Sequence, residues 1–470
     1  MQYIKRACMM TCFLFLIFPF ISTEAAEQAD ERIYYMLIDR YNNGDNDNDI
    51  DIDIDDSDAY HGGDLQGIID KMDDLSDLGI TMINLSPVME AESYHGFDIT
   101  SAQSVNPHFG DIAILQELVS EAQERDMRVI LDFPLSHVSS EHNWNDEQMD
   151  WVQETTENTL GEHLPTVDMS NQDVQEYLME TAIYWLQTSN VDGFHFYVNQ
   201  QTPDDFIEEL NQRLQAEKED VTVIYDGDND QNDMNNTFQS AAVDALKQPG
   251  ESITPILEQD LSGIHFIESV NTPRFAFESV QEGYNPVTRW KLAATLLYTL
   301  PGSSLFYQGV EVPMDNGADE PDHRMAELNK TDEELTEHLD RLSNFRGDSS
   351  ALQQGELEVV AESGAMTVFK RSSSEQTMYV AINNDTETQT VALNDVEDDM
   401  QLRGILDDDI VRQQDDGSYR MILDRETSNI FVLEDDSGLN WFFLSLVAVI
   451  FGGFVFFVVA LNRKGKQAEK

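Results

Sequence analysis

The sequence predicts an α/β chain, followed by a small antiparallel β-domain and a C-terminal transmembrane helix. Short β-rich apolar runs alternate with amphipathic helical patterns across residues 30–310. After about residue 350 the runs alternate or are β-branched, and helix signals are lacking. Residues 441–461 are apolar and carry no charge. Alternation of strands and helices at this spacing indicates parallel strands joined by crossover helices.

Seven of the eight strands that a (β/α)-barrel requires are evident in the alternating region. The remaining one, sixth in chain order, is obscure and falls somewhere in residues 232–262. The expected strands are Tyr34–Asp39, Thr81–Ser86, Arg128–Phe133, Gly193–Val198, Val221–Asp226, Ile264–Ser269 and Ser303–Tyr307. Amphipathic stretches between them include Leu65–Leu78, Ile112–Arg125 and Val174–Ser189. The chain of 470 residues is long enough for a barrel of ~250 residues and one smaller domain. A doubly wound open sheet is the alternative architecture.

The β-rich region near the C-terminus reads as an antiparallel domain that ends near Glu434, with a short linker at 435–440. Its expected strands are Leu357–Ala361, Met366–Lys370, Met378–Asn383 and Thr390–Leu393.

Both ends of the chain predict membrane targeting. Residues 1–25 have the layout of a secretory signal, with Lys5 and Arg6 before an apolar core; an uncleaved anchor is the alternative. The stretch 441–461 is long enough to span a bilayer core of ~30 Å, and Trp441 stands where an interfacial anchor belongs. Basic residues follow in the tail 462–470, which indicates a cytoplasmic end. These features predict a single-pass cell-membrane protein whose large domain is extracellular.

The composition is strongly acidic. Ninety Asp and Glu face 27 Lys and Arg, giving a formal net charge of −63. Such a chain repels nucleic acid and anionic lipid surfaces, so neither is expected as a ligand. A solvated acidic surface facing high salt is the favoured interpretation, with cation storage as the alternative. The two cysteines, Cys8 and Cys12, both lie in the leader, so the mature chain offers no disulfide, thiolate metal site or cysteine nucleophile.

Several stretches carry a family resemblance, in the family's own order along the chain: YYMLIDRYNNGDNDND, HGGDLQGIIDKMDDLSDLGITMINLSPV, YHGFDITSAQSVNPHFGD, ELVSEAQERDMRVILDFPLSHVSSEH and SLFYQGVE. Over roughly residues 31–435 the chain resembles the α-amylase family, glycoside hydrolase family 13, especially its cyclomaltodextrinase- and neopullulanase-like members. The resemblance implies a (β/α)8 TIM barrel over 26–349, with a short B-domain insertion at about 138–170, and a C-terminal β-domain over 350–434. It also implies α-glucans or maltooligosaccharides as ligands.

Retaining cleavage of a glycosidic bond needs two carboxyl groups ~5–5.5 Å apart, and the family adds a third. The resemblance places Tyr197 at the nucleophile, Asp226 at the acid/base glutamate and Asn271 at the third carboxylate. Tyrosine, with an ordinary pKa of about 10, is no substitute nucleophile without a base, and Asp226 is one methylene short. His195 replaces the arginine of the nucleophile motif. The chain is therefore expected to be catalytically degenerate toward glycosides.

Strand periodicity supports this reading of the nucleophile motif. Positions 195 and 197 share one face of a strand, so a register slip of one residue restores no carboxylate there. Asp228 and Glu268 are the other nearby acids that could be recruited.

Substrate-binding residues are implied by the sugar-stacking segment and the third-strand and fourth-strand motifs: His95, Phe97, Asp98, His137 and His195. The alternative is that Phe97 and His137 only pack at the top of the barrel.

A calcium loop of the cyclodextrin glucanotransferase type is implied by residues whose side-chain or backbone oxygens suit this ion. The expected residues are Asn43, Asp45, Asn48, Asp49, Gly62 and Asp64. A flexible acidic loop is the alternative. No organic cofactor is expected.

Three functions follow from these observations. The first is a membrane-anchored protein of carbohydrate metabolism that binds an α-glucan or a protein partner, the partner being unknown, without catalysis. The second is an active retaining α-glucan hydrolase of the α-amylase or cyclomaltodextrinase type. The third is a structural envelope protein.

Overall fold

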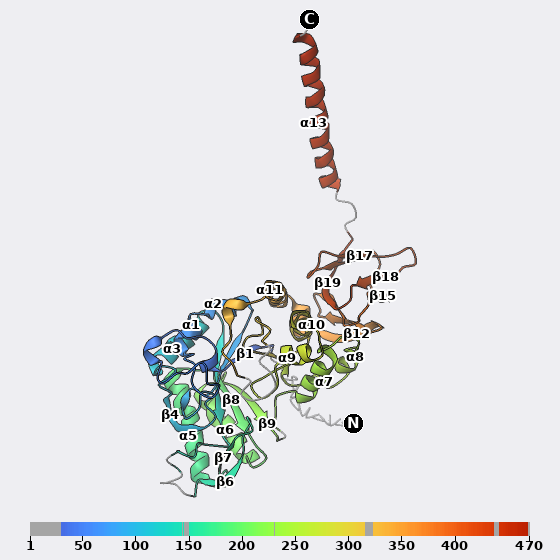
Figure 1. Cartoon of the computed structure of the whole chain (residues 1–470). Coiled ribbons are helices and arrows are strands. Elements are labelled where there is room, and N and C mark those ends of the chain that lie inside the picture. Colours follow the sequence, from blue (N-terminus) through green and yellow to red (C-terminus); the bar gives the residue numbers. More distant parts are fainter. Residues whose placement is uncertain are drawn as a thin grey trace, which may run out of the picture.

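A computed structural model describes residues 30–142, 144, 150–229, 231–314, 323–436 and 441–468 (Figure 1). The predicted signal peptide at 1–25 lies outside the described residues.

The centre of the molecule is a parallel sheet whose described strands follow the order β10–β11–β1–β2–β5–β8–β9. All neighbouring strands pair in parallel. In chain order the strands are β1 (Arg32–Met36), β2 (Met82–Leu85), β5 (Arg128–Pro134), β8 (Gly193–Val198), β9 (Thr222–Gly227), β10 (His265–Phe266) and β11 (Ser304–Tyr307). This sheet fits the predicted barrel plan.

The obscure sixth strand is a single bridge at Met234, which pairs in parallel with Ile264. On one side, Asp233 N–H donates to the Tyr225 carbonyl at 2.8 Å. On the other, Ile264 N–H donates to the Asp233 carbonyl at 2.7 Å. Residues 233–235 therefore lie between β9 and β10 and close the barrel at the edge where the sheet order breaks.

Helices follow the strands and cover the outside of the sheet (Figure 1). Their starts carry side-chain caps: Asp111 accepts from two backbone N–H groups of α3, and Asn171 from one of α5. The helices of the barrel are α1 (Leu65–Ile69), α2 (Met72–Asp77), α3 (Ile112–Gln123), α5 (Gln172–Ser189), α6 (Asp204–Glu217), α7 (Asn236–Leu246), α8 (Thr254–Leu257), α9 (Phe275–Gln281), α10 (Pro286–Thr299), α11 (Glu333–Gly347) and α12 (Ser350–Gln354).

Two hydrophobic clusters lie on opposite sides of the barrel sheet. The larger cluster fills the layer between strands and helices. The smaller cluster fills the inside of the barrel and includes Tyr35, Phe97, Tyr197 and Tyr307. Because strand side chains alternate, the inward-facing residues of every strand meet in this second cluster.

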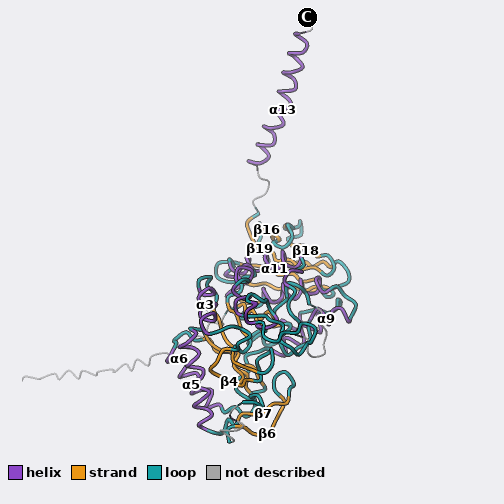
Figure 2. The backbone as a smooth tube through the Cα atoms, turned by 60° about the vertical axis from the view of Figure 1, so that its left-hand side comes forward, coloured by secondary structure: helices purple, strands orange, loops and turns teal. Residues whose placement is uncertain are grey.

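Two hairpins extend from the barrel loops. The first pairs β3 (Met89–Ala91) with β4 (Ile99–Val105), and the second pairs β6 (Val152–Glu157) with β7 (His163–Val167). Figure 2 shows the β6–β7 hairpin at the end of the barrel opposite the C-terminal sheets.

The C-terminal region forms a six-stranded antiparallel sheet in the order β12–β13–β14–β19–β16–β17, with a two-stranded sheet β15–β18 beside it. The strands are β12 (Glu356–Ser363), β13 (Met366–Ser372), β14 (Thr377–Asn383), β15 (Gln389–Leu393), β16 (Met400–Gly404), β17 (Ile410–Arg412), β18 (Tyr419–Leu423) and β19 (Thr427–Asp435).

Arginine side chains are prominent among the fully buried groups: Arg40, Arg274, Arg289, Arg346 and Arg371. Two of them link the barrel to the C-terminal sheets. Arg289 of α10 donates to Asn384 Oδ1 at 2.6 Å and to Glu426 Oε2 at 2.7 Å. Arg371 of β13 donates to the carbonyl of Thr299, at the end of α10.

The predicted transmembrane helix at 441–461 is wrong. These residues belong to α13 (Trp441–Ala468), but none of the helices formed by the described residues is long and apolar enough to cross a membrane. The predictions of a membrane partner and of a cell-membrane location depended on this helix, and the described residues support neither of them.

We expect Arg289→Met to lower the free energy of unfolding by about 3 kcal/mol, because it leaves Glu426 and Asn384 without a donor at a buried junction. Arg403→Met is the matched control, since its partner Glu434 lies 3.2 Å away at a site where the Arg403 side chain is 46 % exposed. The control should change stability by less than ~0.5 kcal/mol. Urea unfolding followed by circular dichroism measures both, and equal effects would contradict the assigned role of Arg289.

Candidate active site

The ends of three neighbouring strands bring the predicted catalytic positions together. β5 carries Asp132, β8 carries His195 and Tyr197, and β9 carries Asp226. In the strand register Asp132 pairs with His195, and Tyr197 pairs with Asp226. These residues lie toward the C-terminal ends of their strands, where this architecture places its active sites.

Asp132 is the centre of the barrel mouth and is fully buried. Its carboxylate accepts hydrogen bonds from Tyr35 Oη at 2.7 Å, Asn84 Nδ2 at 2.6 Å and Tyr197 Oη at 3.2 Å. His195 Nδ1 lies 3.2 Å from Asp132 Oδ1. All these partners stand on strands β1, β2 and β8, so the barrel itself fixes the geometry.

His195 lies between two carboxylates. Its Nδ1 lies 2.9 Å from Asn84 Oδ1 and 3.2 Å from Asp132 Oδ1, and its Nε2 lies 4.0 Å from Asp226 Oδ2. Burial acts to lower the pKa of His195, but the hydrogen bond and charge of Asp132, followed by the charge of Asp226, outweigh it and leave that pKa raised.

Tyr197, at the position predicted for the nucleophile, is a buried side chain that supports Asp132. Burial and the nearby charges of Asp132 and Asp226 raise the pKa of this phenol well above its ordinary value. The phenol therefore stays protonated and donates to Asp132. The ring packs edge-on against Phe97, with centroids 4.8 Å apart, and stacks on His195 at 4.7 Å.

Asp226 keeps an open side, with its side chain 18 % exposed. Burial raises the pKa of this carboxyl group, and His195 opposes the shift. A raised carboxyl pKa suits a group that donates a proton near neutral pH.

Of the other predicted positions, Asn271 and Glu268 do not join this group, whereas the charge of Asp228 helps to raise the pKa of Asp226. Asn271 is exposed in the turn after β10, where its Oδ1 accepts from Ser269 Oγ at 2.6 Å. Glu268 is buried and bound to Arg274 at 2.7 Å and to the Phe275 N–H at 2.6 Å. This pairing makes Glu268 a structural residue.

The predicted substrate-binding residues are all buried: His95, Phe97, Asp98, His137 and His195 are each at most 5 % exposed. Asp98 accepts from the N–H and the Oγ of Ser93 and so shapes its own turn. Both ring nitrogens of His137 are hydrogen-bonded: Nδ1 to Ser136 Oγ at 2.8 Å and Nε2 to Thr156 Oγ1 at 2.9 Å. Burial lowers the pKa of His137 to about 4, so its ring is neutral at physiological pH.

The residues of the predicted calcium loop fall into two groups: Asp64 already has hydrogen-bond donors, whereas two asparagine oxygens have none. Asp64 is occupied by backbone N–H groups of Gly44, Asp45 and Gly67, and caps α1. Asn43 Oδ1 and Asn48 Oδ1 are buried and accept no hydrogen bond.

Gly62 borders the same loop with a φ of +92°, and a Cβ there would come within 2.7 Å of Asn43 Nδ2 and within 2.6 Å of Asp49 Oδ1. The described residues contain no group of three or more His, Cys, Asp or Glu that could hold a metal. A metal ion here would therefore depend on asparagine oxygens.

Sequence reasoning missed Tyr35, Asn84 and Glu162. Asn84 had a signal, because it is the polar residue of the buried strand β2, whose other members are apolar. Tyr35 is one aromatic among several on β1, and nothing in the sequence connects Glu162 to the barrel mouth.

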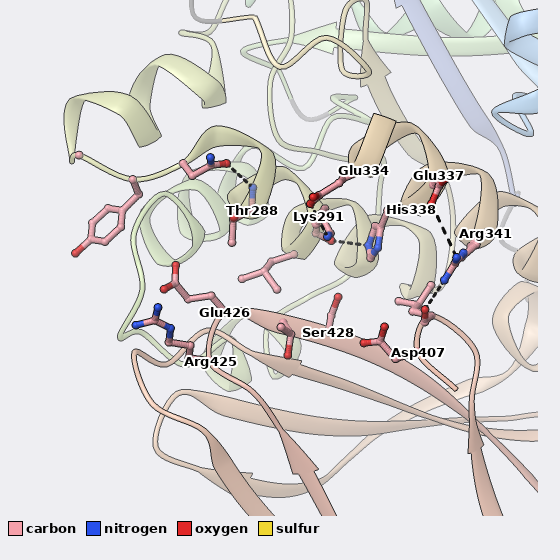
Figure 3. A pocket seen from close by; sticks show the side chains of 16 residues that line it. Thr288, Lys291, Glu334, Glu337, His338, Arg341, Asp407, Arg425, Glu426 and Ser428 are labelled. Atoms are coloured by element: carbon pink, nitrogen blue, oxygen red, sulfur yellow. Dashed lines mark hydrogen bonds and ion pairs between the residues drawn. The ribbon is translucent and has the colours of Figure 1, made fainter. Parts of the chain in front are cut away.

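A polar groove lies away from the barrel mouth, where α10 and α11 meet the turn between β18 and β19 (Figure 3). Its walls hold ion pairs between Lys291 and Glu334 at 3.8 Å and between Arg341 and Glu337 at 4.0 Å. None of the predicted site residues lines this groove.

Comparison with known proteins gives consistent results. The model "Alpha amylase, catalytic domain" matches residues 35–159, and "Alpha-amylase C-terminal domain" matches 355–431. The crystal structure of an Anoxybacillus α-amylase superposes with a TM-score of 0.82 at 33 % identity, covering 87 % of this chain and 99 % of that one.

Two curated relatives are similar over most of the chain. A cyclomaltodextrinase of Thermoanaerobacter pseudethanolicus is 27 % identical over 422 residues, 78 % of this chain and 72 % of the relative. An intracellular maltogenic amylase of Bacillus subtilis is 26 % identical over 432 residues, 81 % of this chain and 73 % of the relative. That relative is named as intracellular, whereas the sequence of this chain predicts an extracellular location.

We expect Asp132→Asn to lower the pKa of His195, because the neutral amide no longer stabilises the imidazolium. The raised pKa of His195 also makes the free energy of unfolding depend on pH. A histidine with a raised pKa in the folded state stabilises the fold fully below its unfolded pKa, and this contribution is lost as pH rises through the folded pKa.

Histidine-selective NMR titration measures the change in the variant. Tyr35→Phe removes one donor to Asp132 but keeps the carboxylate and makes no hydrogen bond to His195, so it serves as the control, with a smaller shift expected. An unchanged His195 titration in Asp132→Asn would contradict the coupling.

Proposed function

The chain belongs to the α-amylase family, and on this premise we propose that its barrel mouth binds α-glucans without cleaving them by the retaining mechanism. The observation that carries the proposal is Tyr197. Its protonated phenol stands at the nucleophile position and donates to Asp132. A neutral phenol offers no negative charge to an oxocarbenium-like transition state.

The remaining carboxylates support the same conclusion. Asp132 is fully buried and accepts from three donors, so its oxygens are already used. Asp226 is partly open and lies 4.0 Å from His195 Nε2; the carboxylates whose charges act on its pKa are Asp132, which is fully buried, and Asp228. Retaining hydrolysis needs two carboxyl groups that face the same bond.

α-Glucan hydrolysis is the second candidate, and the relatives favour it. They are named as a cyclomaltodextrinase and a maltogenic amylase. The raised pKa of Asp226 suits a general acid. In this candidate Asp226 protonates the leaving oxygen, and a group other than Tyr197 stabilises the positive charge that develops on the sugar.

We expect the full chain to bind maltoheptaose or β-cyclodextrin in calorimetry and to release no reducing sugar from them or from pullulan. The double variant Tyr197→Asp, Asp226→Glu places two carboxyl groups at the predicted nucleophile and acid/base positions and should release reducing sugar where the wild-type chain releases none. Reducing-sugar assays measure this gain.

The opposite result identifies the second candidate. Product release by the wild-type chain that disappears in Asp226→Ala would show that the mouth is catalytic as it stands. Glu268→Gln controls for general destabilisation, since Glu268 binds Arg274 away from the reacting positions.

We also propose that the loop at residues 43–49 holds a calcium ion. Asn43 Oδ1 and Asn48 Oδ1 are buried acceptors without donors, and calcium prefers such hard oxygen ligands. Asp45 and Asp49 lie in the same loop and would supply negative charge, whereas Asp64 serves as a helix cap. When bound, the ion would brace the loop that precedes α1.

Calcium should raise the melting temperature at matched ionic strength, and EDTA should lower it by ~5 °C, because a ligand of the native state stabilises it by mass action. Asn48→Ala should abolish the difference between the two conditions. Asp55→Ala, in the exposed acidic run beyond the loop, should retain it. Equal melting temperatures with calcium and with EDTA in the wild-type chain would exclude the site.

A further inference from the structure

The tip of the β6–β7 hairpin, residues 158–162, lies against the barrel mouth. Leu160 packs on the inner cluster that contains Phe97 and Tyr197. Glu162 Oε1 lies 3.0 Å from His95 Nε2. A loop tip that places a leucine and a carboxylate on an aromatic and histidine-bearing surface covers that surface from water.

The hairpin engages two of the three histidines that the family resemblance assigns to the sugar, His95 and His137. The Phe97 N–H donates to His95 Nδ1 at 3.1 Å, so Nε2 carries the proton and donates to Glu162. His137 Nε2 contacts Thr156 Oγ1, on β6, at 2.9 Å. The polar atoms that would meet sugar hydroxyls are thus occupied by hairpin side chains.

The tip is held in shape by its own asparagine. Asn158 Oδ1 accepts from the N–H groups of Leu160 and Glu162, both at 2.9 Å, and its Nδ2 donates to Glu162 Oε2 at 2.9 Å. These bonds hold the carboxylate of Glu162 in the orientation in which it meets His95.

The base of the hairpin is anchored separately. Val167 N–H donates to the Ser136 carbonyl at 2.9 Å, and Val138 N–H donates to the Pro165 carbonyl at 3.2 Å. These backbone bonds involve residues 165 and 167, which lie outside the tip and closer to the base of the hairpin. The tip can therefore lift while β7 stays bonded to residues 136–138.

We infer that the hairpin tip is an autoinhibitory contact, in which Leu160 and Glu162 occupy the place of a glucan at the barrel mouth. Leu160 covers the aromatic surface as the apolar face of a sugar ring would, and Glu162 accepts from His95 as a hydroxyl oxygen would. A glucan binds after the tip lifts, and its apparent affinity is reduced by the closed fraction. This inference rests on the proposed function, because the displaced ligand is the glucan named there.

Hydrogen exchange of the full chain tests closure without any ligand. In Leu160→Ala, Glu162→Gln the amides of residues 94–98 should exchange about tenfold faster than in the wild type, because two of the covering contacts are gone. Glu157→Gln is the matched control: it is exposed at the end of β6, on the same hairpin, and should leave these amides unchanged. If circular dichroism shows that the double variant is unfolded, Glu162→Gln alone replaces it.

Calorimetry with maltoheptaose tests the functional consequence. The double variant should bind about tenfold more tightly than the wild type, while Glu157→Gln should match the wild type. Unchanged exchange at residues 94–98 in the folded variant overturns the inference. Faster exchange with no glucan bound by any of the proteins overturns the proposed function and supports closure of the mouth by the tip.

Discussion

The buried carboxylate of Asp132 is the constraint around which the barrel mouth is organised. A carboxylate removed from water is tolerated only when donors surround it. Here Tyr35, Asn84 and Tyr197 supply those donors, and His195 lies beside them. The Tyr197 phenol, at the predicted nucleophile position, is thus one of the donors that stabilise a buried negative charge at the centre of the barrel.

Much of this site could be predicted from strand periodicity. Residues 195 and 197 were expected on one face, and both side chains do point to Asp132 inside the barrel. Asp226 was assigned by the family resemblance instead, and the strand register places it beside Tyr197 on the next strand. Period-two patterns are informative where a strand is long and buried, as β8 is over all six of its residues.

Other features left no such pattern. The sixth strand is a single bridge at Met234, which is too short to have any period. Asn271 could be placed in the family motif, but its exposure in a turn depends on the path of the chain after β10. Glu162 reaches His95 from 67 residues away, and only the folded hairpin brings the two together. Apolarity alone also misled at 441–461, where hydropathy was read as a membrane span.

The burial of arginine has a consequence for the outside of the molecule. The chain has 27 basic residues, and its interior takes up Arg40, Arg274, Arg289, Arg346 and Arg371. Arg40 and Arg274 are paired there with the buried carboxylates of Asp39 and Glu268, so burial removes both signs of charge and the large negative excess stays in the shell in contact with solvent. Dissolved counterions must supply the balance, which ties the compactness of this protein to the ionic strength of its surroundings.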